Sequence, residues 1–231
     1  MGRYQCNNIL FALTFTLLSC YFRHSKAQIL PGKIYLELFY ANPWHKAKYG
    51  RCEFFPHEKG CDVFFKICIW NGTTFSSSHC DVGRQTTETF EDAKTVVLGG
   101  EDYVQVPLRT FPPPTIRLRV EAWDKDRLSS HDHIVSFVSE AVELDSRAPL
   151  RTINLLKIDR TSDNEDVEIK VSLKLECASH YHGRLCEIYC QPDFKSYTCD
   201  SQGNRVCYPG FAGPMCNMKD YCFFEPCAPF A

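Results

Sequence analysis

The chain has 231 residues, a formal net charge of −2 at pH 7 and an isoelectric point of about 6.4. Nucleic-acid-binding surfaces are strongly basic, so this balance gives no reason to expect a nucleic-acid partner. Fourteen cysteines are too many for an ordinary cytosolic protein, and they indicate an oxidising, extracellular compartment.

Residues 1–27 are typical of a signal peptide. Arg3 supplies a positive charge, residues 9–18 form a short apolar run, and Ser25-Lys26-Ala27 resembles a cleavage site. The run is too short to span a membrane comfortably, and an uncleaved anchor is the alternative. No other stretch approaches 18 apolar residues, so we expect a soluble, secreted product. A membrane-bound parent protein is the alternative if the chain is a fragment.

Residues 28–175 are predicted to form a β-domain. Apolar and polar side chains alternate over 34–40, 116–122 and 167–175, a period of two that is typical of strands with one buried and one solvated face. Turn signals such as Asn71-Gly72 separate further strands, which are expected at 61–70, 94–98, 103–107, 133–138 and 150–156. No long stretch has a clear helical period. Seven or eight strands favour an antiparallel sandwich.

Four cysteines lie in the first half of this domain, and we expect the pairs Cys52–Cys61 and Cys68–Cys80. The second pair would close the turn that contains Asn71-Gly72-Thr73. This tripeptide is an N-glycosylation sequon, which predicts a glycan on Asn71. Asn-Gly is also a favoured hairpin turn, so a plain turn is the alternative.

Residues 176–216 form a second, cysteine-rich module with almost no conventional core. Its cysteines lie at 177, 186, 190, 199, 207 and 216. Six cysteines allow 15 pairings, and sequence alone does not choose among them. The spacing of nine residues favours three consecutive loops, Cys177–Cys186, Cys190–Cys199 and Cys207–Cys216. Zinc is the competing interpretation, but no C-x2-C pair is present. The tail, 217–231, holds Cys222 and Cys227, which suit a small bridge or a truncated EGF repeat.

The second module resembles the DSL module of the Delta/Serrate/Jagged family of Notch ligands. The resemblance rests on the cysteine spacing together with aromatic and glycine positions, namely Tyr181-His182-Gly183, Cys190-Gln191-Pro192, residues 193–199, Gly203-Asn204 and residues 210–216. A generic EGF-like module is the alternative. Residues 33–40, 61–68 and 116–124 resemble the N-terminal domain of the same ligands, which has a C2 fold. The expected architecture is therefore mainly β, a C2-like antiparallel sandwich followed by a small disulfide-rich module.

The resemblance implies a receptor-binding role for the loop between Cys190 and Cys199. It assigns Phe194 to the receptor-binding face. Tyr197 is expected to contribute both to the interface and to packing within the module. We also include their neighbours Asp193 and Lys195. This loop is shorter than is usual in the family and contains fewer Arg and Asp residues, which bears on charge-based recognition.

The C2 resemblance also implies chemistry on the sandwich loops. C2 domains often place an Asp-x-Asp pair after a strand, where carboxylates chelate calcium; Asp124 and Asp126 fit that pattern, and Asp132 is a further candidate. An ordinary acidic turn is the alternative. The opposing loop, 41–50, presents Trp44, Lys46 and Lys48, which suits contact with a lipid surface.

The predicted function is a secreted ligand or modulator that binds the EGF repeats of a Notch-family receptor in cell–cell signalling and cell-fate decisions. The family resemblance implies that ligands activate the receptor by pulling on it from a neighbouring cell, which a soluble ligand cannot do. The protein could therefore act either as a competitive antagonist or as a co-ligand of an anchored partner. The alternative is a secreted lipid- or matrix-binding protein whose DSL module is only structural. An enzyme is not expected, because the sequence lacks G-x-S-x-G, a glycine-rich phosphate loop and H-E-x-x-H.

Overall fold

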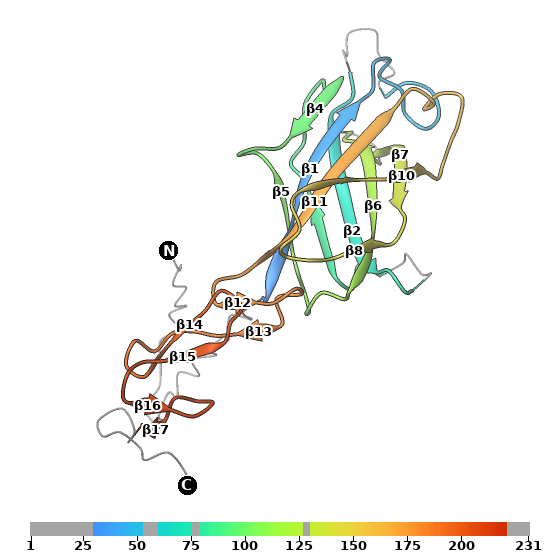
Figure 1. Cartoon of the computed structure of the whole chain (residues 1–231). Helices are drawn as coiled ribbons and strands as arrows, with labels where there is room; N and C mark the ends of the chain where they lie inside the picture. Colours follow the sequence, from blue (N-terminus) through green and yellow to red (C-terminus); the bar gives the residue numbers. More distant parts are fainter. Residues whose placement is uncertain (1–29, 53–59, 75–78, 127–129, 221–231) are drawn as a thin grey trace, which may run out of the picture.

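The computed structural model describes residues 30–52, 60–74, 79–126 and 130–220. Every regular element in these ranges is a strand. Two antiparallel sheets form a sandwich, and a narrow extension of three two-stranded ladders projects from one end of it (Figure 1). The predicted fold class is confirmed.

The two sheets hold eleven strands. In the first sheet the order is β4-β1-β11-β9, and β5 pairs with β1 beside β4. In the second sheet the order is β10-β7-β6-β2-β3, and β8 pairs with β6. The first sheet contains β1 (Gly32–Ala41), β4 (Thr95–Leu98), β5 (Val104–Pro107), β9 (Arg151–Ile153) and β11 (Glu168–Cys177). The second contains β2 (Val63–Asn71), β3 (Gly83–Thr86), β6 (Thr115–Asp124), β7 (Asp132–Ser139), β8 (Val142–Glu143) and β10 (Leu155–Lys157).

The core lies between the sheets and is built from the alternating strands that the sequence predicts. Every second side chain of β1, β6 and β11 is buried, because period two sends them all to one face. These inward residues are Ile34, Leu36, Leu38 and Tyr40 on β1, Ile116, Leu118, Val120 and Ala122 on β6, and Ile169, Val171, Leu173 and Leu175 on β11.

The segment predicted as one strand at 150–156 is in fact two strands in different sheets. β9 pairs with β11, whereas β10 pairs with β7, so the chain crosses between the sheets at Asn154. Ile153 packs into the core from the first sheet and Leu155 from the second. Strands that change sheet at a corner are common in sandwiches, and an apolar run alone does not reveal the bend. β3 and β8 were not expected either, since both are short and neither alternates clearly.

The extension consists of β12 (Tyr181–His182) with β13 (Ile188–Tyr189), β14 (Tyr197–Cys199) with β15 (Arg205–Cys207), and β16 (Phe211–Ala212) with β17 (Met218–Lys219). The five disulfides among the described residues are Cys52–Cys61, Cys68–Cys80, Cys177–Cys186, Cys190–Cys199 and Cys207–Cys216. The last three are the pairs that the spacing of nine residues favours, and the first two are the pairs expected in the sandwich. The proposed Cys222–Cys227 bridge and the signal peptide lie outside the described residues.

The first and third ladders are copies of one unit at a constant offset of 30 residues. Tyr181 corresponds to Phe211, Gly183 to Gly213 and Cys186 to Cys216. The backbone agrees in detail: the two glycines have φ of 87° and 86°, and the two cysteines have φ of 57° and 52°. In each copy the cysteine N–H donates to the glycine carbonyl, at 3.3 Å and 3.0 Å. The x-x-Gly-x-x-Cys pattern is therefore one hairpin used twice.

The first copy is continuous with the sandwich. β11 ends at Cys177, which pairs with Gly32 on β1, and Ala178 donates its N–H to the Pro31 carbonyl at 2.9 Å. A side chain at position 32 would collide with the Glu176 carbonyl, so glycine is needed where the strands approach. Cys186 is fully buried in the core cluster, and Leu185 packs against it. The joint is thus part of the sandwich rather than a linker.

Candidate functional site

The loop between Cys190 and Cys199 is ordered by one carboxylate. Asp193 Oδ1 accepts the backbone N–H groups of Lys195 at 2.8 Å, Ser196 at 2.8 Å and Tyr197 at 3.0 Å. Its Oδ2 accepts the Ser196 hydroxyl at 2.5 Å. These bonds favour the charged form, so they hold the pKa of Asp193 well below its usual range, the Ser196 hydroxyl being the largest cause. A disulfide closes the loop at its base.

Phe194 stands at the tip of this loop and is 79% exposed. Its φ is 58°, in the left-handed region that a bulky side chain rarely adopts. Tyr197 is only half exposed, because its hydroxyl donates to the Gln191 carbonyl at 2.8 Å and the Arg205 guanidinium lies 4.5 Å from its ring. Lys195 is exposed. The four predicted binding residues therefore share one loop but differ in role: Phe194 projects into solvent, whereas Asp193 and Tyr197 make contacts within the loop.

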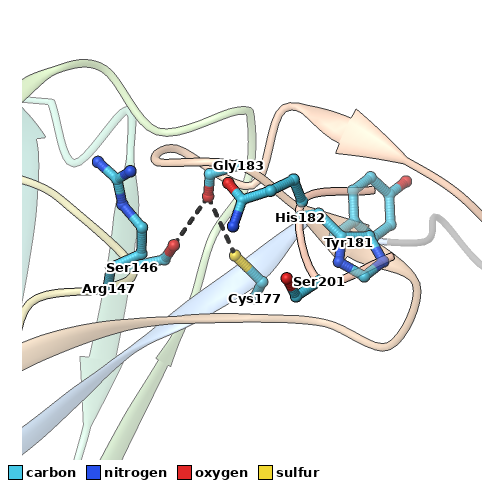
Figure 2. A pocket seen from close by; sticks show the side chains of 8 residues that line it. Ser146, Arg147, Cys177, Tyr181, His182, Gly183 and Ser201 are labelled. Carbon is cyan, nitrogen blue, oxygen red and sulfur yellow. Dashed lines mark hydrogen bonds between the residues drawn. The ribbon is translucent and has the colours of Figure 1, made fainter. Parts of the chain in front are cut away.

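The joint between the modules has its own contacts (Figure 2). Ser146, from the loop after β8, donates its hydroxyl to the Gly183 carbonyl at 2.8 Å and its N–H to the Arg184 carbonyl at 2.8 Å. The pocket beside it is lined by Ser146, Arg147, Cys177, Tyr181, His182, Gly183, Ser201 and Gln202. Its volume of about 230 Å³ is below the roughly 300–1,000 Å³ of a typical small-molecule site. We therefore regard it as part of the joint.

An aromatic row crosses this joint on the surface. Phe111, from the sandwich, contacts Tyr181 edge to face at 6.3 Å between ring centroids, and Tyr181 contacts Tyr189 at 5.1 Å. Phe111 and Tyr189 are 58% and 51% exposed. Phe111 and Tyr189 were not predicted as site residues, because single aromatic residues far apart in the chain give no signal of their proximity.

The opposite end of the sandwich carries the loop predicted to touch lipid. Trp44 is 63% exposed, and Tyr49, which the sequence analysis did not name, is 78% exposed. The two lysines between them are already paired with acids of a neighbouring loop: Lys46 Nζ lies 2.9 Å from Asp163, and Lys48 Nζ lies 3.8 Å from Asp159. The two aromatic side chains are thus exposed, while the charges of the lysines are partly neutralised.

The predicted calcium ligands Asp124 and Asp126 lie at the end of β6 and just beyond it. Asp124 occupies an inward position at the end of β6 and is fully buried. Its Oδ1 accepts the Asp62 N–H at 2.6 Å, and its Oδ2 has no hydrogen-bond partner among the described residues. Burial, opposed by that bond and reinforced by the charges of Asp126, Asp62 and Asp132, raises the pKa of Asp124 to about 7. No group of three or more His, Cys, Asp or Glu side chains in the described ranges is arranged to hold a metal ion.

One arrangement resembles a serine-hydrolase relay. His133 Nε2 lies 2.8 Å from the Ser136 hydroxyl, and His133 Nδ1 lies 3.2 Å from Asp159 Oδ2. Ser136 is only 6% exposed, however, whereas a nucleophile must reach its substrate. Asp159 Oδ1 also accepts the Ser136 N–H at 2.8 Å. These contacts attach the loop after β10 to β7, which accounts for the arrangement without catalysis.

The predicted glycosylation site lies at the end of β2. Asn71 Oδ1 accepts the Thr73 N–H at 3.1 Å and the Thr73 hydroxyl at 2.9 Å. Asn71 and Thr73 of the sequon therefore lie in one turn.

Among the residues that the structure describes, no helix is long and apolar enough to cross a membrane.

Comparison with known proteins agrees with this architecture. Residues 177–219 match the family model described as "Delta serrate ligand". The chain is 27% identical to "Protein jagged-1" from Homo sapiens over 176 residues, covering 68% of this chain and 13% of that protein. It is 26% identical to "Delta-like protein B" from Danio rerio over 163 residues, covering 67% and 26%. The chain thus spans at most about a quarter of the length of these relatives.

A solved structure, "Structure of Drosophila C2-DSL-EGF1", matches with a TM-score of 0.59 at 21% sequence identity. The match covers 82% of this chain and 87% of that chain, so the sandwich and the cysteine-rich extension have the same fold in both proteins. Together, these comparisons show a DSL module at residues 177–219 in a chain that is similar to the jagged and Delta-like proteins.

Proposed function

We propose that this protein binds the EGF repeats of a Notch-family receptor in cell–cell signalling, with Phe194 as the anchor of the interface. The supporting observation is a large aromatic side chain that is 79% exposed on a loop fixed by a disulfide and by Asp193. A fixed loop loses little conformational entropy on binding, and exposed aromatic residues are frequent interface hot spots. No catalytic step is part of this proposal.

The sandwich contributes to the same interface in this proposal. The joint at Ser146 and Cys186 is packed, so a receptor that follows the long axis of the molecule meets both modules in a fixed relation. The exposed row of Phe111 and Tyr189 lies along that path. The proposal includes secretion and an N-glycan on Asn71.

Replacing Phe194 by Ala is expected to weaken receptor binding by about 2 kcal/mol, or roughly 30-fold, because the anchor is lost while the loop remains closed. Surface plasmon resonance against a receptor fragment containing the EGF repeats measures this. Phe211→Ala is the matched control, since Phe211 is an exposed aromatic on β16 of the same module. Unchanged binding of the Phe194 variant would show that the interface lies elsewhere.

A second function, contact with a lipid surface, is supported by Trp44 and Tyr49 on one loop. Aromatic side chains of this kind insert at the headgroup level of a bilayer. The loop lies at the end of the sandwich opposite the DSL module, because it follows β1 whereas the module follows β11 (Figure 1). Lipid and receptor would therefore be bound at separate places.

The double variant Trp44→Ala/Tyr49→Ala is expected to reduce binding to vesicles of phosphatidylcholine and phosphatidylserine by about tenfold, with receptor binding unchanged. Co-sedimentation measures the first quantity. Phe111→Ala is the control, since it removes an exposed aromatic from the other end of the sandwich. If vesicle binding persists in the double variant, this loop is not the lipid contact. If vesicles bind but Phe194→Ala has no effect on the receptor, the lipid-binding role stands alone.

A further inference from the structure

The conformation of Phe194 requires an explanation. A φ of 58° disfavours any residue with a Cβ, and Phe has neither the small size of glycine nor the polar side chain of asparagine. Left-handed conformations of bulky residues persist only where the surroundings over-determine them. Phe194 is largely exposed, so its own side chain provides little of that support.

The support comes from the preceding residue. Asp193 Oδ1 gathers three consecutive backbone N–H groups, those of residues 195, 196 and 197, and Oδ2 holds the Ser196 hydroxyl. A single oxygen can meet three consecutive N–H groups only if the chain turns sharply after position 193. That turn places residue 194 in the left-handed region. The hydrogen bonds of the Asp193 carboxylate and the φ of Phe194 therefore depend on each other.

We infer that Asp193 is a positioning residue, which acts on the receptor through Phe194 rather than by touching the receptor itself. This inference rests on the proposed function. It reassigns one of the four predicted binding residues, because the Asp193 carboxylate is engaged inside the loop by four donors. Without those bonds the loop would visit other conformations, and the apparent affinity would fall by the fraction that remains competent.

The next turn of the module supplies a matched control. Asp200 Oδ1 accepts the N–H groups of Gln202 and Asn204, both at 2.8 Å, and Oδ2 accepts the Asn204 amide at 3.0 Å. It performs the same capping in the β14–β15 turn, seven residues further on, but has no exposed aromatic beside it. Loss of Asp200 therefore reports general loosening of the module without displacement of Phe194.

The test measures association and dissociation rates of the full chain against a receptor fragment containing the EGF repeats. Asp193→Ala is expected to weaken binding roughly tenfold, mainly through slower association, because fewer molecules hold the competent loop. Asp193→Asn is expected to stay within about threefold of the parent, since an amide oxygen caps the same turn. Adding Asp193→Ala to Phe194→Ala should cause no further loss, and Asp200→Ala should bind as the parent does.

Three results would overturn the inference: an Asn variant as weak as the Ala variant, which indicates a charge contact with the receptor; additive losses in the double variant, which indicate an independent contact; or full binding by Asp193→Ala. If Phe194→Ala itself binds normally, the proposed function fails instead.

Amide hydrogen exchange tests the loop without a receptor. The amides of residues 195–197 should exchange faster in Asp193→Ala and at the parent rate in Asp200→Ala. Should Asp193→Ala misfold, Ser196→Ala removes only the Oδ2 bond and should show a smaller loss of the same kind.

Discussion

Replacing Cys177 and Cys186 by Ser is expected to lower the unfolding free energy of the sandwich by about 2–5 kcal/mol, although both cysteines belong to the DSL module. Cys186 is fully buried in the core cluster, and Leu185 and Tyr181 pack against it. The substitution removes a cross-link and also introduces a hydroxyl where apolar groups surround it, which carries its own cost. The module and the sandwich should therefore lose stability together.

Tryptophan fluorescence during guanidinium unfolding measures this effect on the sandwich alone, because all three tryptophans, Trp44, Trp70 and Trp123, lie in it. The Cys207→Ser/Cys216→Ser variant is the matched control. It opens a loop with the same sequence separation of 9 residues, so the chain-entropy contribution is equal. Its fluorescence midpoint should match that of the parent. Equal shifts in the two variants would mean that the first loop is not part of the sandwich.

The second large effect is a loss of stability with rising pH that depends on Asp124. Its pKa is about 7 in the folded protein, against 3.8 for the ordinary group, so between these values the folded state binds more protons than the unfolded state. The contribution of Asp124 to the unfolding free energy is therefore fully present at low pH and is lost as the pH rises through 7. The difference in pKa corresponds to about 4 kcal/mol at most. The physical reason is that the fully buried carboxylate must become charged while its Oδ2 lacks a partner among the described residues.

Asp124→Asn is expected to remove this dependence. The variant keeps an acceptor for the Asp62 N–H and should unfold at higher guanidinium concentration than the parent at pH 8. The difference should be smaller at pH 5 and should vanish below about pH 4, where the carboxyl is protonated in both states. Comparing the two proteins at each pH cancels the contribution of His133, whose pKa is lowered by burial and which acts in the opposite direction. A parent protein no less stable at pH 8 than the Asn variant, measured in EDTA, would contradict the assignment.

The same pair of proteins tests the calcium prediction. If calcium binds at Asp124 and Asp126, adding it at pH 8 stabilises the parent and not the Asn variant, because the ion neutralises the buried charge. Equal responses would leave the acidic turn as the better interpretation.

The fold was predictable where one rule applied throughout an element. β1, β6 and β11 have strict alternation, and their inward side chains are the ones that the pattern selects. The same rule breaks down where a tertiary constraint acts. Residues 150–156 look like one apolar strand, but the chain turns from one sheet to the other at Asn154, a choice that depends on both sheets being present. Asp124 shows the converse: it continues the alternation of β6 into a position that a carboxylate rarely occupies.

The candidate site was predictable in composition but not in mechanism. The loop and Phe194 were predicted from the family resemblance, which rests on the cysteine spacing and the aromatic positions. The division of work between Asp193 and Phe194 depends on hydrogen bonds to backbone N–H groups, which sequence spacing does not specify. The row from Phe111 to Tyr189 depends on segments that meet only in three dimensions. Local patterns thus indicate candidates such as Phe194, and only the folded chain shows how they are held and which residues lie beside them.

The duplicated hairpin has a consequence for altering the surface of this protein. Tyr181 and Leu185 of the first copy adhere to the sandwich, while their counterparts in the second copy, Phe211 and Met215, face solvent at 37% and 55% exposure. Among the described residues, the same hairpin therefore packs against the sandwich in the first copy and is exposed to solvent in the second. Hydrophilic replacements that make the protein more soluble belong at Phe211 and Met215. The same replacements at Tyr181 and Leu185 would disrupt the packing between the DSL module and the sandwich.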